Sequence, residues 1–252
     1  YNKVARTLIA FEYLWYEAWC SSIESAKAGL QATLIIRHPE TEKLYVNFDQ
    51  ELLQLMREAK CLAKLNVDIP ESGKIVLLQE EKFKIYYNEL KFILHEYERI
   101  HGKVIPVIAK LVEPHIQTME LKLRPGMVTL TWTSMNIDAY KNHILTGLAA
   151  LEDLITKIND IVESRISKNL KNLSRSVVCN LPSDSTLALD EFVAIQETAV
   201  KTATTFLTSK NLEVEMAVSD LFQILANNPI DPSVEPAPDS EINTVKHHFN
   251  SL

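Results

Sequence analysis

Apolar residues recur at alternating steps of three and four along most of this 252-residue chain, which is the spacing of one face of an α-helix. This spacing predicts helices over the following ranges: Val4 to about Leu30, the cap residue Asp49 to about Asn66, about Leu77 to His101, Pro106 to a turn at Pro125, about Ile137 to Asn172, and about Leu187 to Ala226. The last two are long enough to fold back on each other as an antiparallel hairpin. The pattern predicts an all-α fold of elongated helical bundles.

Residues 33–48 break the helical pattern and predict a small β-hairpin. Two β-prone runs, Thr33–His38 and Lys43–Phe48, flank the four-residue loop Pro39–Glu42. In the second run apolar and polar residues alternate, as they do in a strand with one buried face. Because a two-stranded ribbon is marginally stable alone, its apolar face is expected to pack on neighbouring helices.

The stretch LKLRPGMVTLTWTSMNID, residues 121–138, also interrupts the helices. Its Pro-Gly pair predicts a turn that ends the preceding helix. The following residues are expected to form an extended strap, with the leucine and the tryptophan pointing inwards, the threonines outwards, and a serine or asparagine capping the next helix. The residues assigned to this structural joint are Pro125, Gly126, Leu130, Trp132 and Ser134.

These elements divide the chain into four consecutive segments. A first helical bundle with the hairpin covers residues 1–123, the extended joint covers 124–136, and a long helical hairpin covers 137–226. The proline-rich residues 227–252 predict a linker followed by a short terminal helix. The chain shows no repeat of fixed period, which disfavours a spectrin-like spacer.

Composition narrows the classes of function. The formal net charge is -7, so no overall basic field attracts nucleic acid or anionic lipid, and we expect neither as a partner. No apolar run approaches the roughly 20 residues that span a bilayer. The widely spaced Cys20, Cys61 and Cys179 favour reduced thiols in a cytosolic compartment. Because the chain starts without methionine inside a helical pattern, we expect it to be a segment of a longer protein.

The residues give no catalytic, cofactor-binding or metal-binding site. The glycines lie at least about twenty positions apart, whereas a phosphate-binding loop needs several close together. His95 and His101 in HEYERIH are too far apart to face one metal ion, which needs histidines about four apart on a helix. Cys20 and Cys61 fall on core positions of predicted helices, and we expect both to be buried structural residues.

The stretch FEYLWYEAWC, residues 11–20, is unusually aromatic for one helix. Five aromatic residues lie in its first nine positions, more than one helix face holds. Two interpretations stay open: the helix is buried on all sides in a wide bundle, or it presents aromatic anchors to a partner, as interfaces commonly do. The candidate interface residues are Tyr13, Trp15, Tyr16 and Trp19.

Two stretches carry a family resemblance. The first is RHPETEKLYVNFDQELLQLMREAKCLAKLNVDIP at residues 37–70, with a hairpin, Asn-Phe-Asp and a leucine-rich helix that ends at Ile-Pro. The second has the form Leu-x-Pro-Gly-x-x-x-Leu-x-Trp-x-Ser, here at Leu123, Pro125, Gly126, Leu130, Trp132 and Ser134. Together they resemble the N-terminal tail region of dynein heavy chains, and their details look most like an axonemal outer-arm heavy chain.

The resemblance implies a non-catalytic segment. Such tails are elongated series of helical bundles that bind dynein intermediate chains and neighbouring dynein heavy chains, while the ATPase ring lies far towards the C-terminus. The implied function is a scaffold for assembly of a ciliary microtubule motor, located in the cytoplasm, on the cytoskeleton and in the axoneme of the cilium. The resemblance implies no cofactor for this segment, and the full-length parent would be a microtubule-motor ATPase.

A second class of function remains open from the residues alone. An all-α enzyme or metal protein can have ligands that converge only in the folded chain. Thermal stability with and without ATP or divalent metals distinguishes the two classes, because a ligand that binds only the folded state must raise stability.

Overall fold

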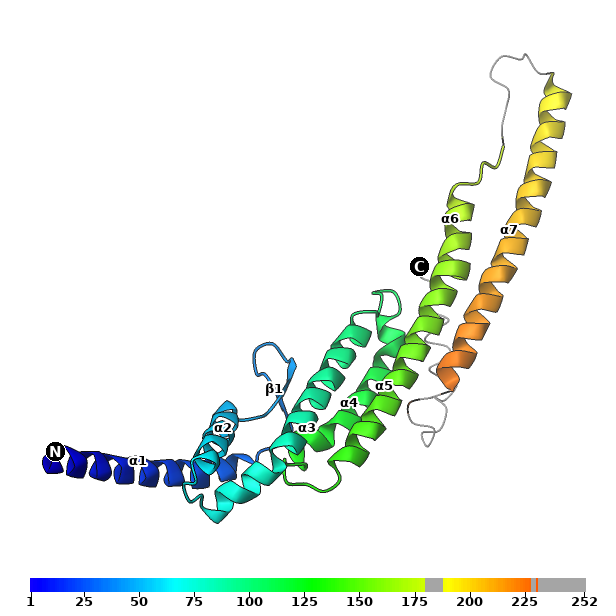
Figure 1. The fold of residues 1–252 in the computed structure, drawn as a ribbon. Helices are drawn as coiled ribbons and strands as arrows, with labels where there is room; N and C mark the ends of the chain where they lie inside the picture. The colour runs from blue at the N-terminus through cyan, green and yellow to red at the C-terminus, as the bar shows by residue number, and fades with distance from the viewer. Residues whose placement is uncertain (180–187, 228–229, 231–252) are drawn as a thin grey trace. The chain divides into compact units, whose positions relative to one another are not determined.

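The computed structural model describes residues 1–179, 188–227 and 230 of the chain (Figure 1). Within them the fold is mostly α-helical with one two-stranded hairpin, which confirms the expected fold class. The helical elements are α1 (Asn2–Gly29), α2 (Gln50–Lys64), α3 (Glu71–His101), α4 (Ala109–Val128), α5 (Ile137–Asp160), the π-helical segment η1 (Ile161–Ser167), α6 (Lys168–Ser174) and α7 (Leu189–Ala226). The strands are β1 (Ile35–Arg37) and β2 (Leu44–Val46).

The structure divides into two compact units, and each unit combines two stretches of chain. Unit 1 contains Tyr1–Arg99 and Met119–Leu148. Unit 2 contains Ile100–Thr118 and the described residues from Ala149 onward. Apart from residues 227 and 230, the predicted C-terminal linker and short terminal helix lie outside the described residues.

The predicted hairpin is present in unit 1. Strand β1 pairs antiparallel with β2, and Ile35 lies opposite Val46 in the register. Ile35 and Leu44 are buried, so one face of the ribbon contributes to the core. An antiparallel bridge between Thr33 and Thr131 adds the segment after α4 to the edge of the hairpin. This extra pairing and the helix packing stabilise a ribbon that would be marginal in isolation.

Helix α2 packs on the C-terminal half of α1 in unit 1 (Figure 1). The Asp49 carboxylate accepts the backbone N–H of Glu51 at 2.8 Å and caps α2, which confirms the predicted cap. One apolar cluster joins both helices to the turn before α3, and its buried members are Trp19, Ile23, Ala59 and Ile69. Burial of these side chains anchors the C-terminal half of α1 against α2.

Glu80 of α3 is a buried carboxylate of unit 1 with two cationic partners. Its side chain is only 5% exposed and forms ion pairs with the ammonium groups of Lys84 and Lys60. The hydrogen bond from Lys84 lowers the pKa of Glu80, although burial alone would raise it. Because a buried charge without a partner is strongly destabilising, these lysines are needed for Glu80 to stay ionised.

Lys141 of α5 is a buried cation of the same unit. Its ammonium group pairs with Glu89 and Asp138 and lies 4.4 Å from the centre of the Tyr86 ring. Burial alone would lower the pKa of Lys141, but hydrogen bonds with Asp138 and Glu89 outweigh burial and raise it. Burial and the 2.8 Å hydrogen bond that Tyr86 donates to Asp138 raise the pKa of Tyr86 to about 12. This polar network ties α3 to the start of α5.

In unit 2, α7 runs antiparallel to η1 and α6, as predicted for the two long helices (Figure 1). Arg165 pairs with Asp220, and four residues further along, Asn169 hydrogen-bonds to Glu213. The residue numbers rise on one helix as they fall on the other, which establishes the direction. Leu221 of α7 is fully buried.

The first of these long helices differs from the prediction in one detail. The sequence predicts an unbroken α-helix from Ile137 to Asn172, whereas residues 161–167 form the π-helical segment η1. Each π-helical turn is wider than an α-helical turn, so the segment changes which side chains face a neighbouring helix. Its buried residues are Ile161, Val162 and Ile166. A periodicity of three and four cannot reveal this local widening.

Candidate interaction surface

The four candidate interface residues on α1 divide into two pairs. Trp19 is only 5% exposed and its indole N–H donates to the Glu58 carboxylate at 3.1 Å. Tyr16 is half-buried, and its hydroxyl donates to the backbone carbonyl of Asp68 at 2.6 Å. Trp19 is therefore a core residue, which corrects its assignment to an interface. Tyr13 and Trp15 point to solvent, with 61% and 45% of their surface exposed.

The N-terminal half of α1 presents further large apolar side chains to solvent. In Figure 1 this half of the helix extends beyond α2. Ile9 is exposed on one side of it, and five exposed apolar side chains share the other side: Val4, Leu8, Phe11, Leu14 and Trp15. We call these five side chains the α1 ridge. Contiguous apolar surface of this kind is typical of binding sites for other proteins, since isolated apolar residues are more common on the surface of a monomer.

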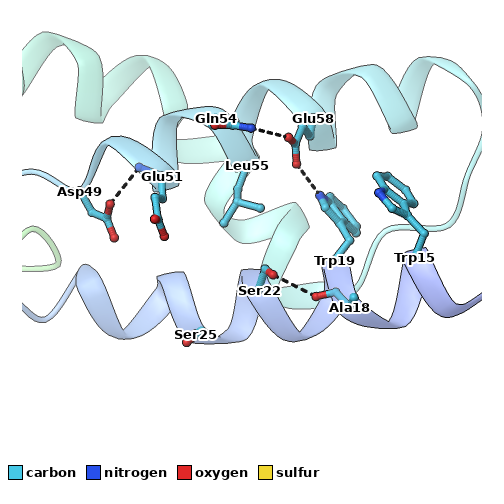
Figure 2. A pocket seen from close by; sticks show the side chains of 10 residues that line it. All are labelled: Trp15, Ala18, Trp19, Ser22, Ser25, Asp49, Glu51, Gln54, Leu55 and Glu58. Carbon is cyan, nitrogen blue, oxygen red and sulfur yellow. Dashed lines mark hydrogen bonds between the residues drawn. The ribbon is translucent and has the colours of Figure 1, made fainter.

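A groove of about 580 Å³ lies between α1 and α2, next to the ridge. Figure 2 shows the side chains that line it: Trp15, Ala18, Trp19, Ser22 and Ser25 from α1, and Glu51, Gln54, Leu55 and Glu58 from α2 together with its cap residue Asp49. The rings of Trp15 and Trp19 stack at a centroid distance of 6.4 Å and an interplanar angle of 13°. The groove therefore combines an aromatic wall with three carboxylates.

The acidic wall of the groove was not assigned from the sequence. Glu51 and Glu58 are seven residues apart, so they lie on the same face of α2 two turns from each other. That spacing alone could have identified an acidic face on α2. The groove itself depends on α1, because only the packing of the two helices places Glu58 beside Trp19 and leaves Glu51 at the other end of the same groove (Figure 2).

The segment after α4 inserts Leu130 and Trp132 into unit 1. They are 8% and 2% exposed. The Trp132 indole N–H donates to the Asn47 carbonyl at 2.7 Å. The Trp132 and Phe48 rings contact each other edge-on, with 4.6 Å between their centroids. The Leu130 carbonyl accepts the N–H of Leu34 at 3.1 Å. Both side chains point inwards as the sequence predicted, and they connect this segment to the hairpin.

The turn predicted at Pro125 and Gly126 is wrong, because both residues belong to α4. Proline removes one helical hydrogen bond, but the carbonyl of Pro125 accepts two backbone N–H groups that close the end of the helix. Gly126 is required for close packing: a Cβ there would lie 2.2 Å from the Tyr140 hydroxyl oxygen. That hydroxyl donates to the Leu123 carbonyl at 2.8 Å, so the glycine makes room for a buried contact between α4 and α5.

Ser134 closes a tight turn instead of capping α5. Its hydroxyl accepts the N–H of Thr131, and its own N–H donates to the Thr131 carbonyl, both at 3.0 Å. The first helical hydrogen bond of α5 runs from the N–H of Tyr140 to the carbonyl of Asn136 at 3.0 Å. Ser134 therefore shapes the backbone beside Trp132.

The cysteines and the possible metal ligands are the remaining candidate groups. Cys61 is exposed on α2, so its expected burial is wrong, whereas Cys20 is partly buried against the α1–α2 cluster. Among the described residues, histidine, cysteine, aspartate and glutamate side chains nowhere gather in threes as ligands for a metal ion. None of the helices over residues 1–179 and 188–227 combines the length and apolarity needed to cross a bilayer.

Comparisons with known proteins agree with the resemblance. Residues 1–140 match the family described as dynein heavy chain, N-terminal region 1. The chain is 41% identical over 250 residues to the dynein gamma chain of the flagellar outer arm of Chlamydomonas reinhardtii, which covers 99% of this chain and 6% of that protein. It is 34% identical over 232 residues to dynein axonemal heavy chain 5 of Mus musculus, covering 92% of this chain and 5% of that protein.

Dynein axonemal heavy chain 8 of Homo sapiens is a third relative, 34% identical over 224 residues that cover 89% of this chain and 5% of that protein. The chain thus spans 5% to 6% of the length of these relatives. The match to the family covers α1, the hairpin, α2, α3 and α4. From these matches, the chain belongs to the dynein heavy chain family and carries its N-terminal region 1.

Proposed function

We propose that this chain is a non-catalytic tail segment of an axonemal dynein heavy chain and that it scaffolds assembly of the motor. Its partners are dynein intermediate chains and neighbouring dynein heavy chains. The location follows from the same proposal: the cytoplasm, the cytoskeleton and the axoneme of a cilium. The names of the relatives support it, since they are flagellar outer-arm or axonemal heavy chains.

The α1 ridge is the structural observation that carries the proposal. Phe11 is 68% exposed and Leu14 64%, yet both lie on a helix whose other end is packed into a core. Exposed aromatic and aliphatic side chains gain free energy when a partner removes them from water, at about 25 cal/mol per Å² of apolar surface. Aromatic residues are also the type that most often carries binding energy at interfaces. The ridge is therefore suited to a protein partner.

The glycine spacing supports a non-catalytic role for the segment. The closest pair of glycines is Gly126 and Gly147, and the structure gives each a packing neighbour that a Cβ would approach closely, Tyr140 for the first and Met119 for the second. Phosphate-binding loops use clustered glycines because only backbone without a Cβ wraps closely around phosphate. In the proposal, ATP hydrolysis belongs to another part of the parent heavy chain.

Site-specific cross-linking inside the assembled motor tests this function. A photo-reactive amino acid at Phe11 is expected to cross-link to an intermediate chain or to a neighbouring heavy chain. The matched control is Val128, an apolar residue of unit 1 that is 63% exposed and lies outside the ridge. Absence of any intersubunit cross-link from Phe11, or equal cross-linking from Val128, contradicts an assembly surface on the α1 ridge.

Ligand-dependent stability tests the enzymatic or metal-protein alternative. Thermal unfolding of the chain is expected to be the same with and without ATP or divalent metals. A ligand at a hundred times its Kd would stabilise the folded state by about 2.7 kcal/mol. A shift of that size with either addition would contradict the scaffold proposal.

A further inference from the structure

The groove between α1 and α2 has a charge that the described chain does not balance. Asp49, Glu51 and Glu58 supply three carboxylates, and among the described side chains that line the groove there is no lysine or arginine. Glu58 accepts hydrogen bonds from the Trp19 indole and the Gln54 amide, and Asp49 accepts a backbone N–H, but these donors are neutral. Among the described side chains, no ion pair joins a lysine or an arginine to any of the three carboxylates.

Two other acidic side chains of unit 1, unlike those of the groove, have cationic partners. Glu80 pairs with Lys84, and Glu120 pairs with the guanidinium of Arg37 at 3.1 Å. The groove therefore leaves an acidic surface whose complement is a cation from outside the described chain.

Trp15 gives the groove a preference among cations. One face of its indole stacks on Trp19, and that ring is held in place by burial and by the hydrogen bond to Glu58. Trp15 has no other ring or cation contact in the described chain and is 45% exposed. A tryptophan face is the best aromatic surface for a cation, and a planar guanidinium stacks on it better than an ammonium group does.

We propose that this groove binds an arginine-bearing segment of a protein partner. The guanidinium stacks on Trp15 and donates hydrogen bonds to the Glu58 carboxylate, whereas Glu51 and Asp49, at the other end of the groove, attract the positive charge of the segment without touching that guanidinium (Figure 2). The groove volume of about 580 Å³ falls within the range of ordinary ligand sites, about 300 to 1,000 Å³. The inference rests on the proposed assembly function, since it specifies the chemistry of a partner.

The position of the groove beside the α1 ridge defines the rest of that partner segment. Trp15 belongs to both surfaces, and Phe11 lies one helical turn before it on the same side of α1. A partner segment that follows α1 would therefore place apolar side chains on the ridge and an arginine in the groove. This is the composition of an amphipathic basic helix.

Fluorescence anisotropy with a synthetic peptide tests the proposal on the 252-residue chain. The probe is a fluorescein-labelled alanine-based helical peptide with arginine and leucine on one face, and its twin has lysine in place of arginine. We expect tighter binding of the arginine peptide, and weaker binding at higher salt because exposed charges are screened. Trp15→Ala should weaken binding by about threefold to tenfold, and Glu51→Gln by about twofold to threefold, because Glu51 attracts the charge of the peptide from the other end of the groove.

Glu24→Gln is the matched control, because Glu24 is an exposed glutamate of α1 outside the groove lining. It should leave the affinity unchanged. An equal loss in Glu24→Gln would assign binding to the overall negative charge and overturn the proposal. Unchanged affinity in Trp15→Ala, or equal affinity for the lysine peptide, would also overturn it. Trp15 and Glu51 are exposed, so both variants are expected to fold, which circular dichroism checks.

The assembly function and the arginine site can be refuted independently of each other. Cross-links from Phe11 without an effect of Trp15→Ala on peptide binding would leave the assembly function standing and remove the arginine site. Peptide binding that depends on Trp15 and Glu51 without cross-links from Phe11 would support the arginine site and contradict assembly through the α1 ridge.

Discussion

Trp132 offers the sharpest test of how unit 1 is held together. Its ring is 2% exposed and makes edge-on contacts with Phe48 at 4.6 Å and with Phe83 at 6.4 Å. Its indole N–H donates to the Asn47 carbonyl at 2.7 Å. The side chain therefore joins the segment after α4 to the end of the hairpin and to α3 at one point.

Trp132→Ala should lower the free energy of unfolding of unit 1 by about 3 to 5 kcal/mol, the usual range for large aromatic residues in a core. The loss combines apolar burial, the cavity that remains and the aromatic contacts with Phe48 and Phe83. Trp132→Phe keeps most of the ring but removes the N–H, so the Asn47 carbonyl loses its donor. That variant should lose about 1 to 3 kcal/mol.

Urea unfolding measured by tryptophan fluorescence suits this test. Trp15, Trp19 and Trp132 all belong to unit 1, so the signal reports that unit even if the two units unfold separately. Trp15 and Trp19 remain as reporters in both variants. Far-ultraviolet circular dichroism, which detects all helices, shows whether unit 2 unfolds at the same urea concentration.

Two results would refute the reasoning. A loss below about 1 kcal/mol in Trp132→Ala would show that the ring is exposed in solution. An equal loss in Trp132→Phe and Trp132→Ala would show that the hydrogen bond to Asn47, and not the ring packing, carries the stability.

Three further predictions follow from single contacts. Gly126→Ala should destabilise unit 1 by about 1 to 3 kcal/mol in the same urea assay, because a Cβ there collides with the rigid Tyr140 ring. Gly147→Ala should be nearly neutral, because its Cβ meets the flexible end of the Met119 side chain. The lysine hydrogen bonds lower the pKa of Glu80, so the stability that ionised Glu80 contributes is present above its unfolded pKa and is lost as pH falls through its folded pKa. Glu80→Gln should therefore flatten the fall in unfolding free energy below about pH 5. An unchanged profile of unfolding free energy against pH would contradict the ion pairs. Tyr86→Phe should remove an ionisation step near pH 12 from the tyrosinate absorbance titration.

Local patterns were sufficient for the helices, the hairpin and the cap at Asp49. Helix periodicity, strand alternation and capping chemistry act over a few neighbouring residues, so one stretch of sequence contains what each needs. The inward direction of Leu130 and Trp132 was predictable for the same reason. The family motifs were also readable, because they are runs of adjacent residues.

Three-dimensional packing decided the features that local patterns could not. Pro125 and Gly126 have the residue types of a turn, yet they continue α4, and Gly126 instead makes room for Tyr140 of another helix. Trp19 became a core residue because α2 covers it, while Trp15, on the same helix, stayed exposed. The acidic groove likewise exists only where two helices meet. Side-chain identity determines what a residue can contact, but burial and electrostatic surroundings depend on which distant elements pack beside it.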